Sequence, residues 1–90
     1  MLKILEDLIL LARERKVNPV KGSYTNKLLT DKSLAKEKVF EEINELFEAV
    51  NDNSNTIHEA ADVLYHLIIY LESNRIKIEE IMKELSTRRK

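Results

Sequence analysis

Acidic residues at helical spacing are the part of this sequence best suited to do chemistry. They form two groups, a Glu-Glu-x-x-Glu motif and, further along the chain, a Glu-x-x-Asp motif. Because a helix turns about 100° per residue, the members of each group share one side of a helix, and two such sides can face each other. The five acids of this acidic cluster are Glu41, Glu42, Glu45, Glu59 and Asp62.

The chemistry that such a cluster favours is binding of a hard divalent cation. Carboxylates packed together repel one another and lose their hydration, which is costly unless a cation lies between them. Carboxylates without cysteine ligands select Mg²⁺ or Mn²⁺ over softer ions. Because Mg²⁺ sites commonly share the ion with substrate phosphates, the cluster points to phosphate chemistry.

The acids also have interpretations that need no metal. All five can lie on solvated helix faces, since 34% of the residues are charged. Thr56 followed three residues later by Glu59 is a capping-box pattern at a helix start. Asp62 lies in an otherwise apolar stretch, where an acid requires a metal or else a buried lysine or arginine from another helix.

Histidines and a lysine near the cluster can be interpreted in two ways. His66 lies one turn after Asp62 and can orient a ligand or contact substrate, or be a hydrogen-bonded structural histidine. Lys38 precedes Glu42 by four residues, which fits either an ion pair on a helix surface or a phosphate contact beside the metal. His58, at a helix start, is expected to be exposed.

The composition indicates one small all-α domain over residues 1–90. The chain has one glycine, one proline, no cysteine and no tryptophan, and leucine, isoleucine, lysine and glutamate dominate, as is typical of helices. A chain of this length buries only about 60–65% of the surface that its unfolded form exposes, so its core must be thin. We expect a small bundle of four to five helices.

Apolar residues spaced three and four apart predict where these helices lie. Pro19 and Gly22 separate the first helix from a short second one, for which Ser23 is a candidate cap. Turn-forming residues follow at 30–33 and 51–55. The expected helices span residues 2–16, 24–29, 34–50, 56–73 and 77–88.

The helix expected at 56–73 predicts assembly. From Ala60 to Leu71, Asp62 and His66 are the only residues that are neither apolar nor aromatic. A helix that is apolar on nearly every side must be buried on nearly every side, and the other helices of one short chain cannot cover it. We therefore expect a homodimer, or a larger oligomer built from dimers, that completes the bundle.

Charge and hydropathy argue against several other classes of protein. The 15 basic and 16 acidic residues nearly cancel, so the sequence gives no electrostatic reason to bind nucleic acid. The basic residues 88–90 are expected to be a solvated helix end. The apolar stretch 2–12 carries charges and predicts neither a signal peptide nor a membrane span. We expect a cytoplasmic protein.

Three segments together resemble the phosphoribosyl-ATP pyrophosphohydrolases of histidine biosynthesis. They are GSYTNKLL at 22–29, KVFEEINE at 38–45 and EAADVLYHL at 59–67. The pair Arg15-Lys16 and Pro19 also match that family. The acids belong to the wider all-α nucleotide pyrophosphohydrolase superfamily, similar to MazG-type enzymes, whereas the Ser-Tyr-Thr-x-Lys-Leu and Tyr-His pieces are narrower. The chain departs from the family at Phe40, where a glycine usually precedes the glutamate pair.

The resemblance implies Mg²⁺-dependent hydrolysis of phosphoribosyl-ATP to phosphoribosyl-AMP and pyrophosphate, with a metal-activated water attacking the phosphoanhydride. Glu41 would lie among the metal ligands or beside them. The implied metal ligands are Glu42, Glu45, Glu59 and Asp62, the catalytic acids are Glu41, Glu42 and Glu45, and the candidate substrate contacts are Ser23, Tyr24, Thr25, Lys27, Lys38 and His66.

Two other functions remain open at this point. One is a MazG-like house-cleaning pyrophosphohydrolase acting on (d)NTPs, and the other is a helical interaction module that binds no metal. A separate cyclohydrolase is a possible partner, because the chain has no room for a cyclohydrolase domain of its own.

Overall fold

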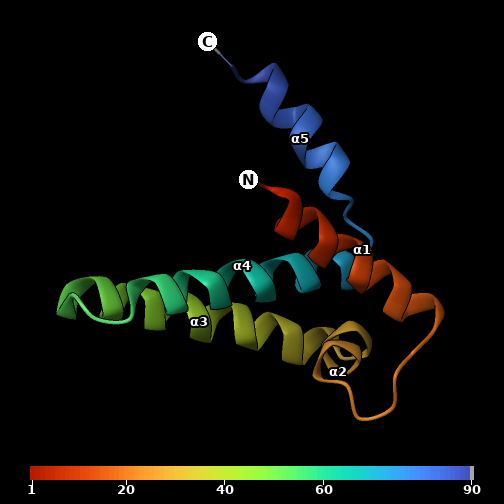
Figure 1. The fold of residues 1–90 in the computed structure, drawn as a ribbon, viewed down its shortest axis with the longest axis horizontal. Coiled ribbons are helices and arrows are strands. Elements are labelled where there is room, and N and C mark those ends of the chain that lie inside the picture. The colour runs from red at the N-terminus through yellow and green to blue at the C-terminus, as the bar shows by residue number, and fades with distance from the viewer. Residues whose placement is uncertain (90) are drawn as a thin grey trace.

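The computed structural model describes residues 1–89, and it confirms the all-α class (Figure 1). Among these residues no strand occurs. None of the helices in this part of the chain combines the length and the apolar character needed to cross a membrane. The five helices are α1 Lys3–Val17, α2 Tyr24–Thr30, α3 Lys32–Asp52, α4 Thr56–Ser73 and α5 Ile78–Thr87.

The predicted and observed helices agree most closely at α4, whose bounds are those expected, and least closely between α2 and α3. We expected a turn at 30–33, but Asp31 is the only residue between the two helices, because it is both the C-cap of α2 and the N-cap of α3. The side chain of Asp31 accepts a hydrogen bond from the backbone N–H of Leu34 at 3.0 Å. The Ser23 cap is confirmed, since its hydroxyl accepts from the N–H of Asn26 at 3.2 Å.

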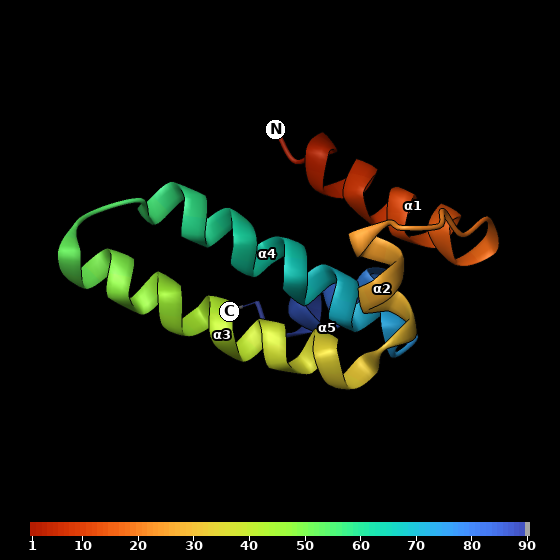
Figure 2. The same cartoon turned by 90° about the horizontal axis from the view of Figure 1, so that it is seen from below.

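Helices α3 and α4 form an antiparallel hairpin and lie side by side along its length (Figure 2). The turn begins with Asn53 in the left-handed region, at a φ of 54°. The N–H of Ser54 then donates to the carbonyl of Ala49 at 3.0 Å, which satisfies a carbonyl at the end of α3. Asparagine tolerates this conformation better than most residues, so the asparagine-rich turn brings the two acidic motifs to adjacent helices.

The core lies where α1 and α2 meet the hairpin. Its fully covered side chains are small or aliphatic, which lets the helices approach closely. Burying one leucine of this kind contributes about 1.5–3 kcal/mol relative to an exposed one. The core residues are Ala12, Leu28, Leu29, Ala35 and Ile69.

The chain leaves much apolar surface uncovered, as the composition of α4 led us to expect. In the C-terminal half of α4 Ile68 and Ile69 are buried, with Ile69 fully covered, but Ile57 and Leu64 in its N-terminal half are 83% and 52% exposed. Helix α5 projects away from the hairpin (Figure 1). Beyond its last turn, Arg88 and Arg89 are exposed as expected, while Lys90 lies outside the described residues.

Candidate active site

The acidic cluster assembles at the seam between α3 and α4. The carboxylates of Glu41, Glu42 and Glu45 on α3 offer oxygen atoms within 4.8 Å of one another. On α4, Glu59 lies close enough to Glu45 for the two carboxyl groups to share a hydrogen bond. Burial differs within the cluster, since Glu42 is only 8% exposed whereas Glu41 is exposed. The seam therefore brings together the acids that the spacing predicted.

The electrostatic state of Glu42 shows how poorly this seam tolerates negative charge. Its pKa is raised to about 7, first because burial removes water from the charged form and next because of a hydrogen bond with Glu45, which requires a shared proton. The charges of Glu45, Asp62 and Glu59 raise it further. The pKa of Glu59 is also raised, again first by burial and then by Glu45. The nearest cation is Lys38, which attracts Glu42 but forms its ion pair with Glu41.

Two carboxylate oxygens in the seam have no hydrogen-bond partner. They are Oε2 of Glu42 and Oε2 of Glu59, and both are buried. A buried carboxylate oxygen without a donor is costly, so such atoms require an explanation. An oxygen-only set of this kind suits a hard divalent cation, and the residues present therefore fit Mg²⁺ or Mn²⁺.

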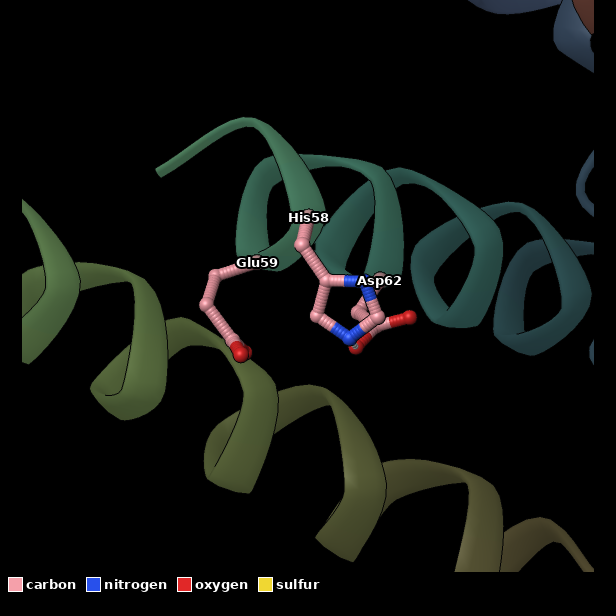
Figure 3. A group of neighbouring side chains, drawn as sticks. All are labelled: His58, Glu59 and Asp62. Atoms are coloured by element: carbon pink, nitrogen blue, oxygen red, sulfur yellow. Dashed lines mark ion pairs between the residues drawn. The ribbon is translucent and has the colours of Figure 1, made fainter. Parts of the chain in front are cut away.

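The geometry removes the capping-box interpretation of Glu59. Thr56 is the first residue of α4 rather than its cap, and Asn55, which precedes it with a φ of 52°, makes no side-chain capping bond. The carboxylate of Glu59 extends toward α3 (Figure 3) instead of turning back to the helix start. A tight left-handed turn occupies the place where an extended capping residue would be needed.

The ion pairs around the cluster differ from those that the sequence suggested, whereas the phosphate contact of Lys38 and the metal at Asp62 stay predictions. Lys38 pairs with Glu41 at 3.2 Å, so the expected surface pair with Glu42 is wrong. Asp62 is half-buried rather than buried, and its partner is not a lysine or arginine of another helix but His58 of its own, at 3.3 Å. His58 is exposed as predicted, yet its spacing of four residues from Asp62 was the signal for this contact.

A hydrogen-bond network fastens α2 beside the cluster. His66 is buried, and its Nδ1 lies 2.7 Å from the carbonyl oxygen of Asp62, so Nδ1 carries the proton and donates. Its Nε2 then accepts from the hydroxyl of Tyr24 at 2.8 Å. Thr25, also buried, exchanges a hydrogen bond with the hydroxyl of Tyr65. Both ring nitrogens of His66 are thus occupied within the protein.

The remaining predicted substrate residues lie around a pocket next to this network. The pocket has a volume of about 580 Å³ and is lined by the loop before α2 and by α2 itself. Lys27 lines it and is exposed, whereas the hydroxyl of Ser23 also accepts from Arg15 at 2.7 Å. Tyr24 belongs both to the pocket and to the network, so it links the pocket to the acidic cluster.

Comparisons with known proteins place the chain among histidine-biosynthesis proteins by sequence. Residues 5–89 match the family described as Phosphoribosyl-ATP pyrophosphohydrolase. The chain is 44% identical over 93 residues to the Phosphoribosyl-ATP pyrophosphatase of Bacillus cytotoxicus, covering 98% of this chain and 85% of that protein. It is 41% identical over 90 residues to the enzyme of the same name from Clostridium acetobutylicum, covering 96% and 81%.

A longer relative has a second function in its name. The chain is 39% identical over 94 residues to the Histidine biosynthesis bifunctional protein HisIE of Pyrococcus furiosus. That match covers 99% of this chain but only 43% of the relative, so the chain spans less than half of the bifunctional protein.

Proposed function

The chain belongs to the phosphoribosyl-ATP pyrophosphohydrolase family, and from this premise we propose that it hydrolyses phosphoribosyl-ATP to phosphoribosyl-AMP and pyrophosphate in histidine biosynthesis. In this reaction a water molecule adds to phosphorus, a phosphoanhydride P–O bond breaks and pyrophosphate leaves. The observation that carries the proposal is the pair of buried, partnerless oxygens on Glu42 and Glu59 in a seam of five acids.

A divalent cation is part of the proposal. When bound, it supplies positive charge to phosphate oxygens and lowers the pKa of a coordinated water. The two partnerless oxygens and the raised pKa of Glu42 support a cation at this seam over one elsewhere. We assign the metal to Glu42, Glu45, Glu59 and Asp62, with Mg²⁺ as the expected ion and Mn²⁺ as its substitute.

The chain's own residues then have separate tasks. We propose that Glu41 accepts the proton of the attacking water, and its exposure and its ion pair with Lys38 support this role. Lys38 contributes positive charge toward the substrate phosphates, as does Lys27 from the pocket beside α2. Tyr24 and His66 hold α2 against α4, which keeps the pocket and the acids in register.

The test compares substrates. Purified protein is incubated with phosphoribosyl-ATP and Mg²⁺, and pyrophosphate release is measured with and without EDTA. We expect release that EDTA abolishes and that added Mg²⁺ restores. Turnover of dNTPs without turnover of phosphoribosyl-ATP would replace the proposed substrate, and the absence of both turnover and a thermal shift with Mg²⁺ or Mn²⁺ would favour an interaction module.

We propose further that two copies of the chain pair through an apolar face of the hairpin. This face consists of the exposed stripes of α3 and α4. In each helix the stripe members are seven and ten residues from the first, so they share one side of that helix. The stripes are 61–64% exposed on α3 and 36–83% exposed on α4. The apolar face comprises Phe40, Phe47, Val50, Ile57, Leu64 and Leu67.

Burial of this face offers a role for Phe40, the residue that departs from the family pattern. A large exposed apolar patch commonly marks an interface. The test is sedimentation velocity at micromolar concentration, where we expect a dimer that Phe47→Glu converts to monomer. Glu48→Gln, one residue along the same helix, serves as a control that should remain dimeric. A stable, active wild-type monomer would overturn the dimer.

We also propose a cyclohydrolase as partner, because a bifunctional histidine-biosynthesis protein contains a region similar to this chain. The test is analytical ultracentrifugation of the chain mixed with a separately expressed cyclohydrolase of the same organism. Co-sedimentation would support the pairing, and independent sedimentation at tens of micromolar would contradict it.

A further inference from the structure

His58 stands at the open edge of the acidic cluster, in the first turn of α4. Figure 3 shows its imidazole lying over the carboxylate of Asp62, while the carboxylate of Glu59 extends toward α3. The Nε2 of His58 is 3.3 Å from Oδ2 of Asp62. His58, Glu59 and Asp62 each offer one ligand atom within 4.8 Å of the others. Two ligands of one first-row ion lie up to about 4 Å apart, so this spacing is close to that of a shared ion.

A second observation points to a ligand at this place. Glu42, more than nine-tenths buried, directs a partnerless oxygen into the same seam, and Glu59 itself contributes the other such oxygen. The imidazole is 72% exposed, so it lies at the solvent side of the acidic cluster. The group of His58, Glu59 and Asp62 on α4 thus lies beside the group of Glu41, Glu42 and Glu45 on α3, and the charges of Glu59 and Asp62 act on Glu42.

We propose that His58 supplies a nitrogen ligand when this site takes a borderline first-row ion such as Co²⁺ or Zn²⁺, whereas Mg²⁺ is held by the carboxylates alone. Imidazole suits the borderline ions, while Mg²⁺ prefers oxygen. His58 thus sets which metals compete with Mg²⁺. The inference rests on the proposed carboxylate metal site and adds to it a residue that distinguishes one metal class from another.

The competing explanation is that His58 only pairs with Asp62 as an exposed ion pair along one helix. Such a pair contributes little and is indifferent to the identity of the metal. Removing His58 would then change the affinities for Mg²⁺ and Co²⁺ by the same factor. The two explanations therefore differ in the ratio of these affinities, not in activity.

The experiment titrates wild-type protein, His58→Gln and Glu59→Gln with Co²⁺ and with Mg²⁺ by calorimetry, and records the visible absorption of bound Co²⁺. We expect His58→Gln to weaken Co²⁺ binding about tenfold or more, as loss of a metal-supporting group does. The Co²⁺ absorption bands should shift as a nitrogen ligand is lost. The Mg²⁺ dissociation constant of this variant should equal that of the wild type. Glu80→Gln, an exposed change on α5, controls for glutamine substitution.

The outcomes separate this inference from the proposed function. Equal changes for Co²⁺ and Mg²⁺, or an unchanged Co²⁺ spectrum in His58→Gln, would overturn the role of His58 while leaving the carboxylate site in place. Full retention of both metals by Glu59→Gln, or failure of the wild type to bind either metal, would overturn the proposed site itself.

Discussion

Each end of α4 lies beside a buried glutamate, and the two glutamates differ in whether cations contact them. Near its start, Glu59 faces Glu42 across the seam, and among residues 1–89 Glu42 has no ion pair, because Lys38 pairs with Glu41 instead. Near its end, Glu72 is 4% exposed and meets two cations. Lys16 lies 2.9 Å from its Oε1 and Arg13 lies 3.3 Å from its Oε2.

Shifted pKa values occur in both ion clusters, downward at the exposed Glu79 and upward at the buried Glu42. Arg13 also bonds Glu79 of α5 at 2.6 Å, and this contact lowers the pKa of Glu79 to about 2 and raises that of Arg13. At the other end, burial and neighbouring acids raise the pKa of Glu42 to about 7. A buried acid that is paired with cations of the chain stabilises the fold. A buried acid without such partners favours binding of a cation from solution.

The largest expected effect is that of a substitution at Glu42. Replacing it by glutamine removes one proposed ligand, so we expect phosphoribosyl-ATP hydrolysis to fall about a hundredfold or more. The metal-free variant should keep its helicity and unfold at no lower temperature than the wild type, because an unpaired buried charge is gone. Steady-state pyrophosphate release and circular dichroism measure the two effects. Wild-type turnover in this variant would remove Glu42 from the site.

Glu72 should respond in the reverse way. Its replacement by glutamine leaves Arg13 and Lys16 without their shared carboxylate and should lower the free energy of unfolding by about 2 kcal/mol. Urea denaturation measures this loss, and specific activity per folded molecule should stay unchanged. Glu79→Gln, an exposed member of the same ion cluster, is the matched control and should have the smaller effect. If the two variants were equally stable, burial would not be what distinguishes these acids.

Between the two ends, the Tyr24 hydroxyl links α2 to α4 at His66. Tyr24→Phe leaves the buried Nε2 of His66 without a donor and should lower the free energy of unfolding by about 1 kcal/mol. We expect Km for phosphoribosyl-ATP to rise more than kcat falls, because the bond positions the pocket rather than the acids. Tyr70→Phe, which alters α4 away from His66, is the comparison variant. An unchanged Km would show that this bond does not position the pocket.

The last prediction concerns pH dependence. The pKa of Glu42 is about 7 in the folded protein and 4.5 ordinarily. Between pH 4.5 and 7 the folded, metal-free protein therefore binds more protons than the unfolded protein does. Its free energy of unfolding therefore falls as pH rises through this window. Melting temperatures in EDTA from pH 4.5 to 8 should show this fall in the wild type and less of it in Glu42→Gln. Parallel curves for the two proteins would contradict the raised pKa.

Local patterns predicted the helices because helix starts, ends and apolar faces depend on neighbouring residues. The bounds of α4, the Ser23 cap and the meeting of the two acidic motifs all follow from short-range spacing. The capping-box alternative at Thr56 failed because the left-handed turn at Asn55 is a property of the hairpin, not of the motif.

Contacts between distant segments could not be read from the sequence. Glu72 meets Arg13 and Lys16 from the opposite part of the chain, and no spacing rule connects them. Likewise, the spacing predicted that Asp62 is the acid whose burial costs the most free energy, but the packing of α3 on α4 buries Glu42 more deeply. Which member of a cluster loses its water is decided by tertiary packing.

The left-handed turn at Asn53 and Asn55 also bears on the order in which the molecule forms. Because of this turn, the seam forms from contacts that are close in sequence, and their loop-closure entropy is small. The contact of Arg13 with Glu79, in contrast, joins residues that are 66 apart in sequence. The acids therefore meet as soon as the hairpin closes, and their repulsion opposes that step. If the proposed divalent cation is present during folding, it should accelerate hairpin closure, so the proposed metal site would affect folding kinetics as well as activity.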